Sequence, residues 1–317
     1  MTVIETLKKS KKPLFTFELL PPRKGHSIEH INSAIDRLIE FEPAYINFTS
    51  HCNETVYRER PDGLIEKKTI RVRPGTIALA AAVKYKYNIT VVPHLLCGGF
   101  TREETENVLI DMKFLGIDDI FALRGDPQKG LRSFIPEKNG HAHAVDLVNQ
   151  IMDMNKGKYL EDDIVNAAPT NFCIGVAGYP EKHFEAPNLQ IDIENLKKKV
   201  DAGAKYIVTQ LFFDNKKFCL FRDECKKIGI TVPIIPGLKP ISVLSDIKLL
   251  PKTFHIDIPN ELFNAVSKCK TDNDVREVGI EWASMQSKEL LKLGAPGIHY
   301  YTLGRSDNIA RIVKSTF

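Results

Sequence analysis

The feature that most constrains this chain is a regular alternation of short apolar runs with longer helical patterns. The runs are rich in β-branched and aromatic residues and are apolar almost throughout, which is typical of strands buried on both faces of a parallel sheet. Eight such runs follow one another, at residues 14–20, 44–49, 89–95, 118–123, 172–177, 206–212, 232–236 and 298–303. The repeated strand–helix order predicts one closed parallel barrel of the (β/α)8, or TIM-barrel, class.

Helix signals between these runs agree with the barrel. We expect Ser27 to cap a helix whose apolar residues, up to Ile39, fall on one face. Thr101 and Glu104 have the spacing of a capping box, and Gly116 is expected to end that helix. No linker divides the chain, so residues 1–317 are interpreted as a single domain, long enough for a barrel of about 250 residues.

Two stretches interrupt the rhythm. Residues 53–76 are charged and contain Pro61-Asp62-Gly63 at their centre, which predicts a surface hairpin after the second strand. The six basic residues of this stretch are more typical of a solvated face than of a ligand site. Residues 130–140 follow the fourth strand and are interpreted as a loop that could act as a lid.

Composition excludes several classes of protein. The net charge is +4 and no dense basic stripe occurs, which argues against a nucleic-acid binder. No apolar run approaches the roughly 20 residues that cross a bilayer, and residues 1–12 lack the apolar centre of a signal peptide. The six cysteines form no C-x-x-C pair. We therefore predict a cytoplasmic protein with reduced thiols and neither a metal nor a membrane partner.

Polar residues gather where the predicted strands end. In a parallel barrel these ends meet at one rim, where the active sites of such folds lie. Polar groups inside apolar segments cost free energy unless they are paired, so their convergence predicts a ligand site. The residues are Glu18, Thr49, His94, Arg124, Gly125, Asp126, Tyr179, His183, Gln210 and Arg305.

Glu18 is the most informative of them. It lies between Phe17 and Leu19 in the first predicted strand, where poor solvation is expected to raise the pKa of a carboxyl group. A raised pKa suits a general acid at neutral pH. The alternative is an ion pair between Glu18 and Arg23.

Two further patterns point to a nucleotide. Gly125, between Arg124 and Asp126, would let the backbone approach a flat or phosphorylated ligand; the alternative is an Arg–Asp pair that braces a turn. Asp192, Asn195 and Lys199 share one helix face next to Lys198, and together they could bind a ribose and a pyrophosphate, although such a face is usually only solvated.

Other motifs are missing or incomplete. His141 and His143 resemble a metal-binding pair, but no third ligand is evident. No P-loop and no G-x-G-x-x-G motif occurs, so a nucleotide cofactor would have to bind in the barrel itself.

Nine motifs, in order and each at a predicted barrel position, resemble the methylenetetrahydrofolate reductase family over essentially the whole chain. They are Phe17-Glu18-x-x-Pro21-Pro22-Arg23, Pro93-His94-Leu95, Ala122-Leu123-Arg124-Gly125-Asp126, Ala177-x-Tyr179-Pro180, Asp192-x-x-Asn195-Leu196-Lys197, Asp201-Ala202-Gly203-Ala204, Thr209-Gln210-Leu211-Phe212-Phe213, Pro236-Gly237 and Tyr301-Thr302-Leu303-x-Arg305.

The resemblance implies a barrel that holds FAD noncovalently. NADH or NADPH would reduce the flavin and leave, and 5,10-methylenetetrahydrofolate would then take up the hydride to give 5-methyltetrahydrofolate for methionine synthesis. Glu18 matches the family's catalytic acid, which assists ring opening to a 5-iminium cation. Asp126 matches the aspartate between flavin and folate, Gln210 a residue shared by folate and nicotinamide, and Arg305 a folate contact.

For FAD, the resemblance implies a longer set of contacts. The matching positions are Thr49, Ser50, Cys52, His94, Arg124, Gly125, Asp126, Ala144, Tyr179, His183, Ala186, Asp192, Asn195, Lys198 and Lys199. Leu19-Leu20, Ser50 and Gly304 depart from residues common in relatives, and the stretch 53–76 looks longer than in compact ones.

Alternatives stay open at this point. A different flavin barrel, such as a proline-dehydrogenase-like oxidase, would explain the fold but not Gln210 and Arg305. A folate- or flavin-binding module without activity would not need Glu18, Asp126 and Gln210 together. Because the chain ends soon after the eighth helix, we expect no C-terminal regulatory domain. The resemblance is compatible with NADH, NADPH or a partner redox protein as electron donor, and with a homo-oligomer.

Overall fold

The computed structural model describes residues 1–317 except 129–130, 132 and 303. Gly130, the first residue of the predicted lid loop, therefore lies outside the described residues. So does Leu303, the last residue of the eighth predicted strand. The barrel strands are β1 (Leu14–Leu19), β2 (Ile46–Phe48), β5 (Val91–Leu96), β6 (Asp119–Leu123), β7 (Cys173–Gly178), β8 (Tyr206–Thr209), β9 (Ile234–Ile235), β10 (Gly237–Leu238) and β11 (Gly297–Tyr301).

All of these strands pair in parallel, in the order β10-β11-β1-β2-β5-β6-β7-β8-β9. The seventh predicted strand is split by Pro236, which has no N–H to donate to a ladder. The part before Pro236 pairs with β8, and the part after it pairs with β11. This short split strand brings the two ends of the sheet together, and the predicted eight-stranded (β/α)8 barrel is confirmed.

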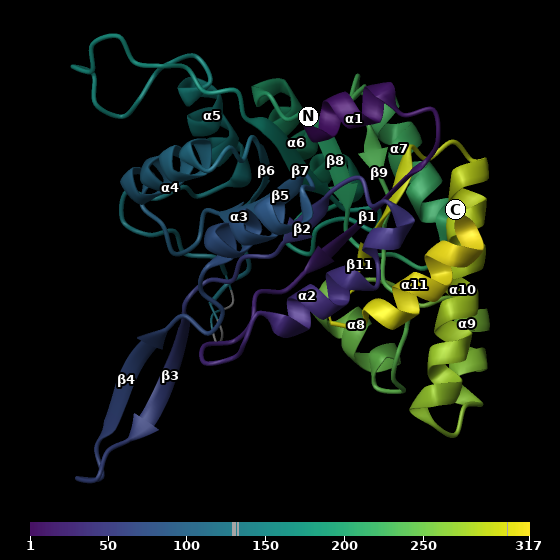
Figure 1. Cartoon of the computed structure of the whole chain (residues 1–317). Helices are drawn as coiled ribbons and strands as arrows, with labels where there is room; N and C mark the ends of the chain where they lie inside the picture. The colour runs from purple at the N-terminus through teal and green to yellow at the C-terminus, as the bar shows by residue number, and fades with distance from the viewer. Residues whose placement is uncertain (129–130, 132, 303) are drawn as a thin grey trace.

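Helices surround the strands (Figure 1). They are α1 (Val3–Lys9), α2 (Glu29–Asp36), α3 (Thr76–Tyr87), α4 (Arg102–Phe114), α5 (Ala144–Met154), α6 (Leu189–Ala202), α7 (Asn215–Lys227), α8 (Asp246–Phe254), α9 (Asn260–Ser267), α10 (Asp272–Lys292) and α11 (Ser306–Thr316), with a short 3-10 turn at Ile39–Phe41. No helix in the described part of the chain is long and apolar enough to cross a membrane.

Capping patterns were predicted with mixed success. The Thr101–Glu104 capping box is present, and each residue bonds the backbone N–H of the other. The expected Ser27 cap is wrong by one position. The N-cap of α2 is Ile28. Ser27 lies before the helix, and its hydroxyl accepts a bond from the N–H of Glu29, the first helical residue. The helix also stops at Asp36, before the last residues of the expected apolar face.

The amino end of the barrel is closed by α1. Val3 is fully buried in a cluster of inward-facing side chains that includes Tyr45 and Tyr206. Its N–H donates a 2.9 Å bond to the carboxylate of Asp119, at the start of β6. Because this end is filled, a ligand has access to the barrel only from the carboxyl ends of the strands.

The predicted hairpin in residues 53–76 is confirmed. Strands β3 (Glu54–Glu59) and β4 (Ile65–Ile70) pair antiparallel over six residues each and project away from the barrel (Figure 1). The base is fixed, because Arg71 donates a 3.2 Å bond to the side-chain oxygen of Asn53. The ring of Phe100 also lies 5.1 Å from the Arg71 guanidinium.

Candidate active site

A cavity of about 640 Å³ lies at the carboxyl ends of the strands. Of the eighteen residues predicted for the site, eleven line this cavity: Glu18, Thr49, Ser50, Cys52, His94, Arg124, Gly125, Asp126, Tyr179, His183 and Gln210. The other seven do not: Ala144, Ala186, Asp192, Asn195, Lys198, Lys199 and Arg305. The residues that line the cavity lie at or just after strand ends, whereas the other seven lie on helices or in loops and stay predictions.

Glu18 lies at the floor of this cavity with only 8% of its surface exposed. Its Oε2 is 3.8 Å from the Nε2 of His94 and 3.8 Å from the Nε2 of His299. Among the described residues these two histidines are its charge partners, whereas Arg23 is exposed at the surface. The alternative of an ion pair between Glu18 and Arg23 is therefore wrong.

Both histidines are held by neighbours on the barrel wall. Thr16 Oγ1 lies 2.8 Å from His299 Nδ1, and the amide nitrogen of Asn47 lies 3.1 Å from His94 Nε2. Burial lowers the pKa of His94 to about 4, so this imidazole is neutral at neutral pH. A neutral His94 accepts the Asn47 bond and leaves the Glu18 carboxyl without a full positive charge beside it.

Asn47 also presents an unsatisfied atom. Its Oδ1 is buried, and no partner for it exists in the described part of the chain, although the residue lines the cavity. A buried acceptor without a partner costs free energy. The arrangement fits a ligand that brings an N–H donor to this point.

A second wall is built around Cys52. A Cβ on Gly98 would come within 2.7 Å of Cys52 Sγ, and one on Gly125 within 3.3 Å. Gly125 also has φ +88°, a left-handed conformation that favours glycine. An added side chain at either glycine would therefore press against Cys52, and Gly125 lines the cavity with backbone alone.

The alternative for Arg124, a bracing pair with Asp126, is wrong. Arg124 pairs with the carboxylate of Glu185, and its guanidinium lies 5.1 Å from the ring centre of Phe134. Asp126 is exposed on the cavity rim. Burial and the nearby Arg124 lower the pKa of His183 to about 4, so His183 adds no charge to this side at neutral pH.

Two residues of the predicted α6 face bond the end of β7 and the loop that follows it. Asp192 accepts a 2.9 Å bond from the N–H of His183, and Lys199 donates a 2.7 Å bond to the carbonyl of Ala177. Burial lowers the pKa of Lys199 to about 8. Lys198 donates to exposed Asn195. Asp192 and Lys199 therefore support His183 and the end of β7 from behind the cavity.

Sequence reasoning missed several cavity residues. They are Asn47, His51, Lys239, Phe254 and His299. Asn47 and His299 are polar residues in the interior of apolar runs, which is the signal that had identified Glu18. Lys239 pairs with Asp246 at 3.2 Å, and Arg305 donates a 3.3 Å bond to the carbonyl of nearby Ser242.

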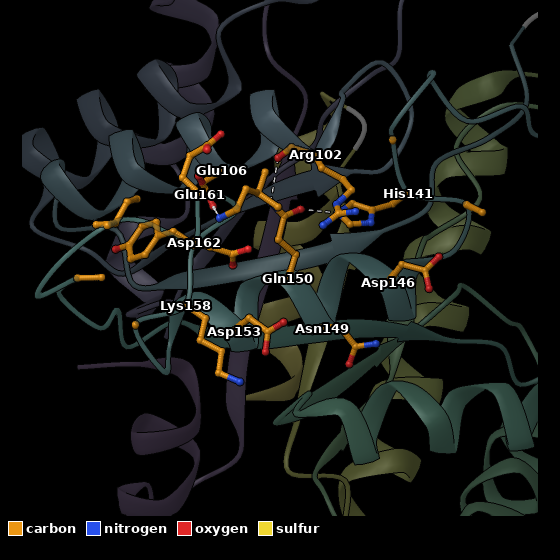
Figure 2. A pocket seen from close by; sticks show the side chains of 17 residues that line it. Arg102, Glu106, His141, Asp146, Asn149, Gln150, Asp153, Lys158, Glu161 and Asp162 are labelled. Carbon is orange, nitrogen blue, oxygen red and sulfur yellow. Dashed lines mark hydrogen bonds between the residues drawn. The ribbon is translucent and has the colours of Figure 1, made fainter.

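A larger cavity of about 1020 Å³ lies outside the barrel, between α4, α5 and residues 157–167 (Figure 2). Its buried polar groups bond one another: His141 pairs with Gln150, Gln150 donates to the carbonyl of Arg102, and Glu106 accepts from the N–H of Leu160. No group of three or more metal-binding side chains occurs in the described part of the chain. We assign the active site to the smaller cavity, because it lies at the strand ends and holds both Glu18 and the unpaired Asn47 Oδ1.

A parallel barrel with a buried carboxyl group in a cavity at its strand ends is typical of an enzyme of the (β/α)8 class. Comparison with known proteins is more specific. Residues 3–316 match the family model for methylenetetrahydrofolate reductase, and the chain belongs to this family.

Individual relatives agree with this assignment. The chain is 33% identical over 311 residues to methylenetetrahydrofolate reductase (NADH) 1 of Arabidopsis thaliana, covering 95% of this chain and 48% of the relative. It is 33% identical over 293 residues to 5,10-methylenetetrahydrofolate reductase of Escherichia coli, covering 92% and 86%. The chain thus spans about half the length of the plant relative and most of the bacterial one.

A solved structure confirms the fold alone. A Clostridium thermocellum protein that binds two copies of 5-methyl-5,6,7,8-tetrahydrofolic acid superposes with a TM-score of 0.55 at 15% identity, covering 98% of this chain and 97% of that protein.

Proposed function

We propose that this protein reduces 5,10-methylenetetrahydrofolate to 5-methyltetrahydrofolate with electrons from NADH or NADPH that pass through noncovalently bound FAD. The observation that carries the proposal is Glu18, a buried carboxyl group that lines the cavity at the carboxyl ends of the strands. Family membership and the folate named in the Clostridium structure support the same substrate class.

The cavity fits the flavin ring of FAD in two respects. Gly125 lines the cavity beside Cys52 without a side chain, which leaves room for a planar ring, and the unpaired Asn47 Oδ1 suits an N–H donor. Thr49, His94, Arg124, Tyr179 and His183 would complete the hold on the cofactor. Ser50, which departs from relatives, lines the same wall. FAD, when bound, supplies the hydride chemistry.

The remaining predicted contacts are proposed to act at the edges of the FAD site. Ala144 begins α5, and the carbonyl of Ala186 accepts a bond from Lys182. Asp192, Asn195, Lys198 and Lys199 would bind the ribose and pyrophosphate side of the cofactor. In this part of the proposal a ribose hydroxyl would share the Asp192 carboxylate with the N–H of His183, which already donates to it.

The chain's own residues then act on the folate. Glu18 donates a proton to the amine that leaves when the five-membered ring opens, a role that a poorly solvated carboxyl group suits. Asp126, exposed on the rim, stabilises the cation that develops on the substrate. Gln210 and Arg305 orient the pterin, and His94 and His299, each 3.8 Å from Glu18 Oε2, hold the carboxyl group in position.

The reaction is proposed to take place in the cytoplasm, where the six free thiols stay reduced. An anaerobic visible-absorbance titration of the purified protein tests the proposal. The flavin band is expected to bleach with NADH or NADPH and to return with methylenetetrahydrofolate. A yellow protein that oxidises proline instead would favour the other class of flavin barrel. A yellow protein that is never reduced would favour a binding module.

A further inference from the structure

The β3–β4 hairpin has no partner in the described molecule. It stands away from the barrel (Figure 1), and three of its large apolar side chains are exposed: Tyr57 by 68%, Leu64 by 62% and Ile65 by 71%. An isolated two-stranded hairpin is marginally stable in water, and its free edges invite further strands. The hairpin is therefore incomplete as a structural unit.

Its charges indicate what completes it. The segment Glu54–Ile70 holds four basic residues, Arg58, Arg60, Lys67 and Lys68, and four acidic ones, Glu54, Glu59, Asp62 and Glu66. The balance gives no net attraction to a nucleic acid or to an anionic membrane surface. On β3, Glu54 and Arg58 lie on the same face with opposite charges, which suits a partner strand with the same sequence running in the opposite direction.

We propose that β3 pairs antiparallel with β3 of a second copy of this chain, about a twofold axis at Val56. This register places Glu54 opposite the partner's Arg58 and Arg58 opposite the partner's Glu54. It also sets Tyr57 diagonally across from the partner's Tyr57, within reach of an aromatic contact. The result is a four-stranded sheet with the isologous symmetry that is commonest among homodimers.

Other registers and the other edge are less favourable. A twofold axis at Tyr57 would set Glu54 opposite the partner's Arg60, which lies beyond β3 in the hairpin turn, and Arg58 opposite the apolar Val56. On β4, the register that joins Glu66 to the partner's Lys68 also sets Lys67 against the partner's Lys67. Like charges directly opposite one another destabilise a strand pair. The edge of β3 is therefore the one built for self-association.

The pairing has a consequence for the active site. Asn53 and Glu54, at the base of β3, line the cavity at the strand ends. In the proposed dimer the partner's Arg58 lies beside Glu54, and the turn of the partner's hairpin reaches residues 51 and 52. Each copy therefore contributes a cation to the rim of the other copy's cavity. This inference does not depend on the reaction that the cavity performs.

Sedimentation velocity of the full chain across a concentration series tests the proposal. One strand pair is a small interface, so we expect a concentration-dependent monomer–dimer equilibrium. Glu54→Arg and Arg58→Glu should each weaken dimerisation at least tenfold, because each sets like charges opposite one another. An equimolar mixture of the two variants should dimerise again, since the mixed pair restores both opposite-charge contacts.

Controls separate this outcome from misfolding. Lys67→Glu makes the same charge change as Arg58→Glu but lies on the other strand, so it should leave the dimer intact. Circular dichroism should show an unchanged barrel in all variants. A wild-type chain that stays monomeric, single variants that dimerise as well as wild type, or a mixture that stays monomeric would each overturn the proposal.

Discussion

Glu18 on the first barrel strand and His299 on the last are neighbours across the β1–β11 pairing, with 3.8 Å between Oε2 and Nε2. The strand register places His299 beside Thr16, two residues before Glu18 on the same face of β1. Thr16 bonds Nδ1 of the imidazole, and Nε2 faces Glu18. Residues from opposite ends of the chain thus define the chemical environment of the proposed acid. Glu18 and His299 meet because the barrel closes by pairing β1 with β11.

Replacing His299 should impair the folate step selectively. In His299→Asn, we expect oxidation of the reduced flavin by folate to slow about tenfold or more, within the range found for groups that assist proton transfer. Reduction by the nicotinamide should stay close to wild type, because His299 adjoins Glu18 on the floor. Stopped-flow measurement of each half-reaction over a range of pH checks this. Equal losses in both half-reactions would indicate a structural role.

Gly125→Ala should weaken FAD retention. The residue has φ +88°, and an added Cβ would press against Cys52 Sγ at 3.3 Å. We expect strain of about 1 kcal/mol and a protein that loses flavin during dilution. Gly63→Ala is the matched control, since Gly63 has φ +77° in the hairpin turn with open space around it. Fluorescence of released flavin measures both, and equal release from the two variants would contradict the wall proposed here.

Asp119 should make stability depend on pH. Burial raises the pKa of this carboxyl group from 3.8 to about 7, against the opposing effect of its bond from Val3. A raised pKa in the folded state means that the folded protein binds the proton more tightly. The contribution of Asp119 is therefore greatest below about pH 4 and is lost as the pH rises toward about 7.

Urea unfolding at several pH values measures this effect. The unfolding free energy of wild type, relative to that of Asp119→Asn, should fall as the pH rises from about 4 to about 7. The asparagine serves as the reference because it does not titrate. A difference that is constant with pH would show that Asp119 is not protonated in the folded protein.

Local sequence signals predicted the barrel well and the site in part. The eight apolar runs located every barrel strand except β10, which lies just after the seventh run, because burial on both faces leaves little room for polar residues. Glu18 and Gly125 were identifiable because each is anomalous in its own segment. The contact between Arg124 and Glu185 was not, since it joins two separate loops and no spacing rule connects them.

The α6 face shows a second limit. Helical spacing correctly grouped Asp192 with Lys199 on one helix, but it gave no information on what that face meets. In the structure the face meets the end of β7 and the loop at His183. The Ser27 cap failed for a similar reason: a hydroxyl can bond a nearby N–H from just outside the helix as well as from its first position.

The central claim is that Glu18 donates the proton for reduction of the folate. Glu18→Gln keeps the shape of the side chain and removes its acidity. After anaerobic reduction with NADH or NADPH, the account predicts that this variant bleaches like wild type but is reoxidised by methylenetetrahydrofolate at least about a hundredfold more slowly. Reoxidation at the wild-type rate would contradict the assignment of Glu18 as the acid.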